Sequence, residues 1–320
     1  MSPVIGEPIH GIHVIDTGFH RPQFDAAYLI VENGRGAFVD SGTSHSVGNL
    51  LRALERAGLN PPDVDWLILT HVHLDHAGGA GALLQHLPNA DVVIHPRGAP
   101  HMIDPARLIA GATAVYGEDE MERSYGRIVP IPEARVVIAG DEHVVDLAGR
   151  ALLCLDTPGH AAHHLCVWDA RSQSVFTGDT FGISYRELDS ERGAFIVPST
   201  SPVQFDPDAM RASIHRILAE APEAVHVTHY GRVTGVQHLG ASLIAQIDGM
   251  VALARDCDGE ADRHARLVAG LVRKYTERAQ REGIADTAAV AALLEMDIEL
   301  NAQGLGVWLD RSRRPAQTHT

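Results

Sequence analysis

A segment of six residues, from His71 to His76, carries three imidazoles and one carboxylate. Imidazole nitrogens and carboxylate oxygens are the donors that bind transition-metal dications in proteins. The apolar run 66–70 predicts a strand before this segment, and the small, glycine-rich residues after it predict a turn into a helix. Side chains two residues apart point the same way in an extended backbone, which allows His71 and His73 to converge on one metal. Asp75 and His76 follow at the turn, and the spacing therefore predicts ligands for two metals.

Three further candidate ligands each follow an apolar run that is typical of a buried strand. His160 comes after a Thr-Pro-Gly turn, Asp179 stands in a Gly-Asp-Thr sequence, and His229 ends the run that starts at residue 224. Functional sites are usually built at the ends of strands on a rigid scaffold. We therefore expect these three side chains to join the ligands of the histidine-rich loop.

These motifs, in this order, resemble those of the metallo-β-lactamase-fold hydrolase superfamily over about residues 10–240. The chain is most similar to the glyoxalase II-like and lactonase-like branches. Residues 93–105 and 200–207 are similar to a prokaryotic subgroup that carries a helical C-terminal tail. The resemblance implies two metals that share a bridging carboxylate. The implied ligands are His71, His73 and His160 for one metal, Asp75, His76 and His229 for the other, and Asp179 as the bridge.

The resemblance implies an α+β fold, a four-layer αβ/βα sandwich, with residues 1–238 as the catalytic domain and 239–320 as a helical subdomain. Local patterns predict some elements directly: a hairpin of 26–31 and 36–40, helices over 47–58 and 206–221, and three C-terminal helices at about 239–256, 260–282 and 286–303. In relatives such a tail can cover the site, and we expect it to shape the substrate pocket here.

The ligand set predicts hydrolysis. A water shared by two dications loses much of its proton affinity, toward a pKa of about 7 in zinc sites, so that hydroxide is available to attack a small thioester or lactone carbonyl. Asp179 would hold the cations together, and Asp75 is also a candidate to take the proton. Tyr185 and Tyr230 are candidate hydrogen-bond donors to the oxyanion. Zinc is the first expectation, with iron and manganese left open because the ligand set contains no thiolate.

Composition and motif spacing exclude several other functions. The net charge of −15 and a pI of about 5.7 oppose binding to nucleic acid, since phosphate contacts need clustered Lys and Arg. The sequence has no Gly-x-Ser-x-Gly elbow and no phosphate-binding loop with Lys. Two alternatives stay open: a phosphodiesterase or organophosphate hydrolase, and a metal-retaining binding or signalling protein with weak turnover.

The three cysteines are odd in number and lack the spacing of metal ligands, which predicts buried free thiols in a reducing compartment. The first residues lack the charged and apolar pattern of a signal peptide, and no membrane span is recognised. We therefore expect a cytoplasmic protein that acts on a small molecule, with no membrane or nucleic-acid partner. A homodimer is left open.

Overall fold

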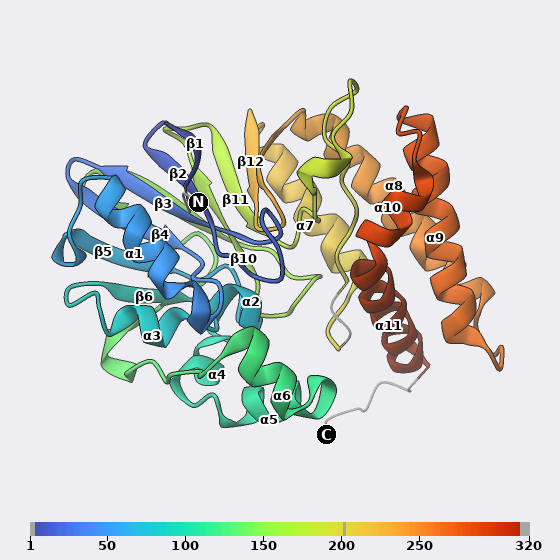
Figure 1. The fold of residues 1–320 in the computed structure, drawn as a ribbon, viewed down its shortest axis with the longest axis horizontal. Helices are drawn as coiled ribbons and strands as arrows, with labels where there is room; N and C mark the ends of the chain where they lie inside the picture. The colour runs from blue at the N-terminus through green and yellow to red at the C-terminus, as the bar shows by residue number, and fades with distance from the viewer. Residues whose placement is uncertain (1–3, 201–202, 314–320) are drawn as a thin grey trace. The chain divides into compact units, whose positions relative to one another are not determined.

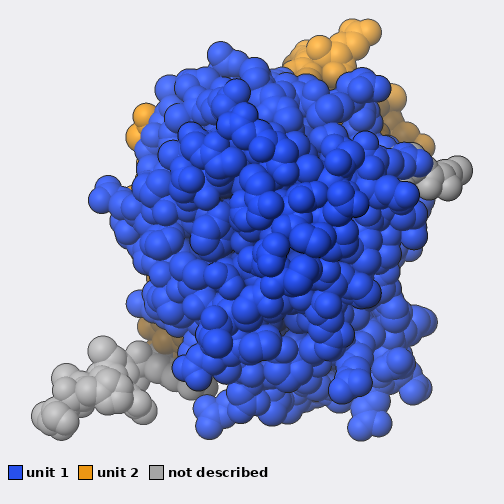
Figure 2. Space-filling view, turned by 90° about the vertical axis from the view of Figure 1, so that its left-hand side faces the viewer, with its two compact units in different colours: residues 1–156, 163–178, 220–234 blue, residues 157–162, 179–219, 235–320 orange. Residues whose placement is uncertain are grey.

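The computed structural model describes residues 4–200 and 203–313, which form two compact units. Figure 2 colours the described residues of unit 1 (4–156, 163–178 and 220–234) blue and those of unit 2 (157–162, 179–200, 203–219 and 235–313) orange. The chain passes between the units several times. The domain boundary predicted after residue 238 stays a prediction.

Seven strands of unit 1 form a sheet whose strand order follows the chain (Figure 1). They are β1 (Val4–Ile9), β2 (Ile12–Asp16), β3 (Ala26–Glu32), β4 (Arg35–Val39), β5 (Val64–Ile68), β6 (Asp91–Ile94) and β7 (Val136–Ile138). Pairing is antiparallel from β1 to β4 and parallel from β4 to β7. Parallel strands end at the same edge of a sheet, so Asp40, after β4, and His71, after β5, follow neighbouring strand ends.

Helices make the crossovers that the parallel strands require. Helix α1 (Val47–Arg56) connects β4 to β5, and the short helices α2 (Leu74–Ala77) and α3 (Ala80–Leu84) connect β5 to β6. The predicted hairpin and first helix are confirmed to within a few residues. Between β6 and β7 the chain forms helices that the sequence patterns did not predict: α4 (Ala99–Ile103), α5 (Ala106–Tyr116), α6 (Glu118–Glu120) and a π-helix (Met121–Tyr125).

The second sheet of unit 1 has six strands in the order β13-β12-β11-β10-β9-β8. They are β8 (Val144–Leu147), β9 (Arg150–Asp156), β10 (Leu165–Asp169), β11 (Ser174–Gly178), β12 (Ala224–Val227) and β13 (Gly231–Thr234). Only the β11–β12 pair of these described strands is parallel. As predicted, β11 ends directly before Asp179, and β12 ends two residues before His229.

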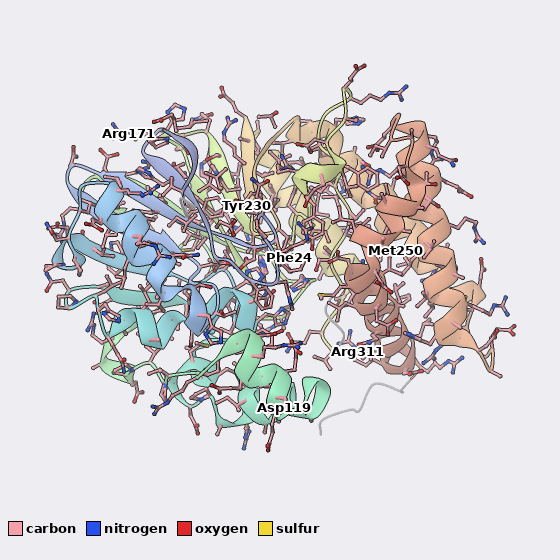
Figure 3. All side chains as sticks on the ribbon, viewed as in Figure 1. Phe24, Asp119, Arg171, Tyr230, Met250 and Arg311 are labelled. Atoms are coloured by element: carbon pink, nitrogen blue, oxygen red, sulfur yellow. The ribbon has the colours of Figure 1, made fainter. Side chains whose placement is uncertain are left out.

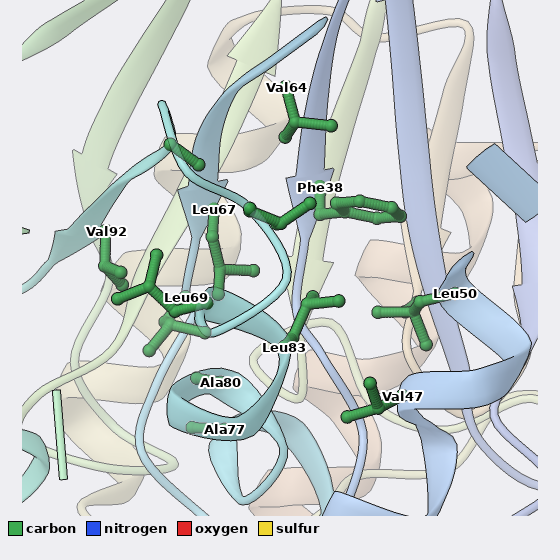
Figure 4. Close-up of a cluster of buried hydrophobic side chains, with 14 of the residues drawn as sticks. Phe38, Val47, Leu50, Val64, Leu67, Leu69, Ala77, Ala80, Leu83 and Val92 are labelled. Carbon is green, nitrogen blue, oxygen red and sulfur yellow. The ribbon is translucent and has the colours of Figure 1, made fainter. Parts of the chain in front are cut away.

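Two large apolar cores pack against the faces of the first sheet of unit 1. One lies between the sheets, where Tyr28 and Ile68 of the first sheet pack with Phe176 of the second. The other covers the opposite face of the first sheet, where Phe38 and Leu67 meet residues of α1 and α3 (Figure 4). Truncating one such buried leucine to alanine costs about 2–5 kcal/mol of folding free energy. The expected α+β class, with two strand-rich halves and outer helices, is confirmed.

Unit 2 is helical, as predicted for the end of the chain (Figure 1). It contains α7 (Pro207–Ala219), α8 (Val236–Asp256), α9 (Arg263–Arg281), α10 (Thr287–Leu293) and α11 (Glu295–Ser312). The prediction of a single third helix at 286–303 is wrong, because the helix is interrupted at Leu294 and continues to Ser312. Gly304 favours an end to the helix by local propensity, but a Cβ at this position would lie 2.6 Å from Thr200 Oγ1. Close packing therefore keeps the glycine inside a continuing helix.

Cys154, Cys166 and Cys257 are buried and form no disulfide, as expected. Burial raises the pKa of the Cys154 thiol to about 12, so this thiol is unreactive at neutral pH. Among the residues described, no helix combines the length and apolar character needed to cross a membrane.

Candidate metal centre

Asp75, His76 and His229 form a triad of metal donors inside unit 1 (the triad below). Asp75 Oδ2 lies 3.7 Å from His76 Nε2 and 3.5 Å from His229 Nε2, and the three donor atoms all lie within 4.8 Å of one another. Donors bound at 2.0–2.1 Å to a tetrahedral zinc ion would be about 3.3–3.4 Å apart. The triad thus fits one dication with three protein ligands. Such a site keeps a coordination position open for water or substrate.

Asp40 fixes the orientation of the His76 ring. Its Oδ2 lies 3.1 Å from His76 Nδ1 and also accepts a hydrogen bond from the Thr228 hydroxyl. Its Oδ1 accepts hydrogen bonds from the backbone and hydroxyl of Thr70. A proton held on Nδ1 leaves the Nε2 lone pair available for a metal. Asp40 has a φ of 60°, a left-handed conformation in which Asp and Asn are enriched.

The carbonyl of Phe24 has the same function for His229. Phe24 O lies 2.9 Å from His229 Nδ1, and the Phe24 ring packs edge-on against the imidazole at 5.4 Å. Phe24 belongs to the loop between β2 and β3 (Figure 3). The sequence carries no signal for this partner, because every residue has a backbone carbonyl. Asp40 did leave a signal, since it is a strand-final carboxylate like Asp179.

His71 and His73 lie together beside the triad. His71 Nε2 and His73 Nδ1 are 2.9 Å apart, and the Thr70 hydroxyl lies 3.2 Å from His71 Nδ1. The His164 ring stacks on His71 with ring centroids 4.9 Å apart. The two ring nitrogens face each other, which brings both imidazoles together as candidate ligands of a second dication, as the spacing of these residues predicts.

The other two predicted ligands lie together in unit 2. His160 Nε2 is 3.5 Å from Asp179 Oδ2, and the Ser199 hydroxyl donates to the same carboxylate oxygen at 3.2 Å. His160 Nδ1 lies 3.1 Å from the carbonyl of Ser199. Gly159 has a φ of +135°, and a Cβ there would lie 2.3 Å from the Met210 backbone. Only glycine allows this close turn, which presents His160.

Each of the seven predicted ligands therefore lies beside another predicted ligand of its own unit. Five are gathered in unit 1 and two in unit 2. The assignment of all seven to one dinuclear site stays a prediction. Of the two candidate tyrosines, Tyr185 donates its hydroxyl to Asp297 Oδ1 at 3.3 Å, and Tyr230 packs in the core between the sheets (Figure 3).

Asp25 is a further acidic residue close to the triad. It is completely buried, and its Oδ2 accepts a hydrogen bond of 2.7 Å from the Thr17 hydroxyl. Burial raises the pKa of the Asp25 carboxyl to about 7, against an opposing effect of His229 and His76. Its place in the sequence, between a loop that contains Pro22 and an apolar strand, gave no sign of this proximity.

A pocket of about 540 Å³ lies in unit 1. Phe19, His20 and Arg123 are among the residues that line it. The His20 ring packs on Phe24 at 5.2 Å, and Phe24 in turn contacts His229. The pocket wall is thus separated from a metal ligand by a single aromatic ring. Its volume is in the range that binds small molecules.

A family model described as the metallo-beta-lactamase superfamily matches residues 20–230. The chain belongs to the metallo-beta-lactamase superfamily. The expected family is thereby confirmed, and members of this superfamily are mostly metal-dependent hydrolases. The histidine-rich loop, His160, Asp179 and His229 all lie within the matched residues.

Two solved structures of the superfamily share the fold. The structure of ST1585 from Sulfolobus tokodaii superposes with a TM-score of 0.65 at 23% identity, over 93% of this chain and 99% of that one. The structure of TTHA1429 from Thermus thermophilus gives a TM-score of 0.64 at 22% identity, over 90% and 94%. Both cover most of the helical unit as well as the sheets, which supports the expected fold class.

Sequence relatives with named hydrolase activities match a smaller part of the chain. A hydroxyacylglutathione hydrolase of Xanthomonas campestris is 31% identical over 163 residues, 50% of this chain and 48% of that protein. An acyl-coenzyme A thioesterase, MBLAC2, of Gallus gallus is 29% identical over 171 residues, 48% of this chain and 56% of that protein. The chain spans about half the length of these two hydrolases.

Proposed function

We propose that the protein is a dinuclear metal-dependent hydrolase of small ester-type carbonyl compounds, thioesters or lactones. The triad carries this proposal. Asp75 Oδ2 lies 3.7 Å from His76 Nε2 and 3.5 Å from His229 Nε2, close to the separation of two ligands on one dication, and both imidazoles have their Nδ1 atoms occupied by an oxygen partner. Both rings therefore offer Nε2 to a metal in the neutral form.

The second metal would be held by His71, His73 and His160, with Asp179 as the bridge. The order of the motifs in the superfamily supports this assignment. The ring partners within each unit support it too, because Thr70 is next to His71 Nδ1 and the Ser199 carbonyl is next to His160 Nδ1. Zinc is the first expectation for both sites, with iron and manganese as the alternatives.

When bound, two dications would lower the pKa of a shared water and polarise the substrate carbonyl. The residues of the chain have to hold this arrangement still. Asp40 and the Phe24 carbonyl occupy the Nδ1 atoms of the triad imidazoles and orient the rings. Asp75 is less buried than the histidines beside it and would accept the proton that the water loses. The pocket beside Phe24 would take the part of the substrate that lies beyond the reacting carbonyl.

A thioester is the first substrate to test. The two relatives with named activities include a hydroxyacylglutathione hydrolase and an acyl-coenzyme A thioesterase, and both names describe thioester cleavage. A small molecule also agrees with the net charge of −15, which repels polyanions. Lactones present the same carbonyl chemistry with a different leaving group.

Turnover of matched thioester, lactone and phosphodiester substrates tests the proposal, with protein whose metal content has been quantified. His73→Ala and Asp179→Ala are expected to lose metal and activity together. Exposed residues of the same types, His86→Ala and Asp119→Ala, serve as controls and are expected to keep both. Turnover of the phosphodiester alone would show that the enzyme attacks a phosphorus centre and not a carbonyl carbon. Fully metallated protein that cleaves none of the three would favour a binding or signalling protein.

A further inference from the structure

The proposed hydrolase mechanism leaves the buried carboxyl of Asp25 without a function. The residue is completely buried, and Thr17 donates its hydroxyl to Oδ2 at 2.7 Å. Within residues 4–200 and 203–313, no hydrogen-bond donor reaches Oδ1. An asparagine or serine would accept the same hydrogen bond from Thr17 without burying an acid. The hydrogen bond with Thr17 therefore does not by itself explain why the residue is an aspartate.

The backbone on both sides of Asp25 is attached to the segment that carries His229. The carbonyl of Phe24 lies 2.9 Å from His229 Nδ1, and the amide of Ala26 donates to Thr228 O at 2.8 Å. Asp25 thus stands between two contacts with a single ligand segment. Its charge interacts with the charges of all three members of the triad.

Charge balance gives a reason for an acid at this position. Two dications bring four positive charges, and the seven proposed ligands include only two carboxylates, Asp75 and Asp179. Positive charge in a buried place is stabilised by additional anionic groups close to it. Partners outside the ligand shell are known to change metal affinity by 10–100-fold. Asp25 supplies a third carboxylate where water is excluded.

We propose that Asp25 is a positioning residue that raises the affinity of the triad for its dication. It acts by its negative charge and, through Phe24, by holding His229 in place. The inference rests on the proposed function, since it assumes that the triad binds metal. A carboxyl that only shaped the loop would leave metal affinity unchanged when replaced by its amide.

Asp16, at the end of β2 where the same loop begins, offers a matched control. Its carboxylate accepts hydrogen bonds from the amides of Gly18 and Gln23, both at 3.0 Å, and so it shapes the loop. It is only partly buried. Asp16→Asn and Asp25→Asn make the same change of charge and nearly the same change of shape. Only Asp25→Asn removes a charge that lies against the triad.

The experiment is a zinc titration of the full-length protein in competition with a chromophoric chelator. Wild type is expected to bind two zinc ions. In Asp25→Asn the affinity of one ion is expected to fall at least tenfold, while in Asp16→Asn both affinities stay within twofold of wild type. Urea unfolding gives a second measurement. Metal-free Asp25→Asn is expected to unfold at no lower urea concentration than metal-free wild type. Added zinc is expected to raise the urea midpoint of the variant by less than that of wild type.

Two results would overturn the inference about Asp25. One is wild-type zinc affinity in Asp25→Asn, and the other is an equal loss in both variants, which would assign the effect to loop shape. If Asp25→Asn does not fold, Asp25→Ser keeps an acceptor for Thr17 and undergoes the same titration. Wild type that binds no zinc would instead refute the proposed function itself. The two failures are therefore distinguishable.

Discussion

Replacing Asp40 by asparagine is expected to weaken metal binding at the triad while leaving the fold largely intact. The two side chains have nearly the same shape, and both tolerate the φ of 60° at this position. The carboxylate accepts from Thr70 N at 2.8 Å through one oxygen and faces His76 Nδ1 at 3.1 Å through the other. An amide has only one oxygen, so it can satisfy only one of these two donors.

The expected loss of metal affinity depends on which nitrogen of the His76 imidazole carries the proton. If the amide oxygen faces Thr70, the amide nitrogen faces His76 Nδ1 and favours the tautomer with the proton on Nε2, which cannot bind metal. Loss of such an outer partner lowers metal affinity by about 10–100-fold, or about 1.4–2.7 kcal/mol. The metal-free protein loses one buried charge-assisted hydrogen bond, which costs about 1–3 kcal/mol.

Competition with a chelator measures the affinity, and nitrogen chemical shifts of the imidazole report the tautomer of His76. Asp40→Ala is expected to be less stable than Asp40→Asn, because it also leaves the Thr70 amide without its acceptor and places alanine at positive φ. Asp119→Asn, on the exposed helix α6, is the control (Figure 3). Unchanged zinc affinity in Asp40→Asn, with the proton still on Nδ1, would refute the argument.

Three other outcomes follow from the structure. Burial lowers the pKa of His226 to about 3, so below pH 6.5 the unfolded chain binds a proton that the folded chain does not. The free energy of unfolding should therefore fall as the pH decreases, by about 2 kcal/mol between pH 7 and pH 5, and His226→Gln should lack this contribution in urea titrations. Gly159→Ala is expected to destabilise by about 2–4 kcal/mol, because the new Cβ would collide with the Met210 backbone, and unchanged stability would contradict this packing. Tyr185→Phe should cost about 1 kcal/mol through its lost hydrogen bond and leave kcat unchanged. A fall in kcat at constant KM would instead support Tyr185 as the oxyanion donor, and Tyr230→Phe is the parallel measurement.

The metal-binding side chains could be predicted from sequence because their signal is local. His71, His160 and His229 each follow an apolar strand, and a strand fixes the direction of the residues at its end. The positions of these ligands within each unit agree with that expectation. Whether the two groups of ligands form one site depends on residues that are far apart in the chain. The sequence predicts such a site only through the order of the family's motifs.

The partners behind the ligands could not be predicted in the same way. Asp40 and His76 are brought together by the parallel pairing of β4 and β5, in which Val39 lies opposite Ile68. Phe24 acts on His229 through a backbone atom, which has no sequence signature. Asp25 is a residue type that is common in loops, and it becomes a candidate for a role at the metal site only when its complete burial is known.

The unpredicted helices between β6 and β7 have a different physical cause. Pro100 and Pro105 stand in this segment and, taken locally, indicate turns. Proline is well tolerated in the first turn of a helix, where its missing amide has no partner to lose. Pro100 lies in the first turn of α4, and Pro105 directly precedes α5. The two prolines therefore mark helix starts here, and periodicity in such short helices is too weak to show it.

The ring partners of the histidines predict how the metals bind. The triad has three ligands in unit 1, and the partners of its imidazoles, Asp40 and the Phe24 carbonyl, also belong to unit 1. The proposed second set divides its ligands, with His71 and His73 in one unit and His160 in the other. Apart from the proposed bridge Asp179, the ligands and supports of the triad metal belong to one unit, and such a site loses less conformational freedom when metal binds. The triad should therefore fill first, and zinc titration of wild type should give two steps, the tighter of which is abolished by His229→Ala. A single step that survives this substitution would contradict the order.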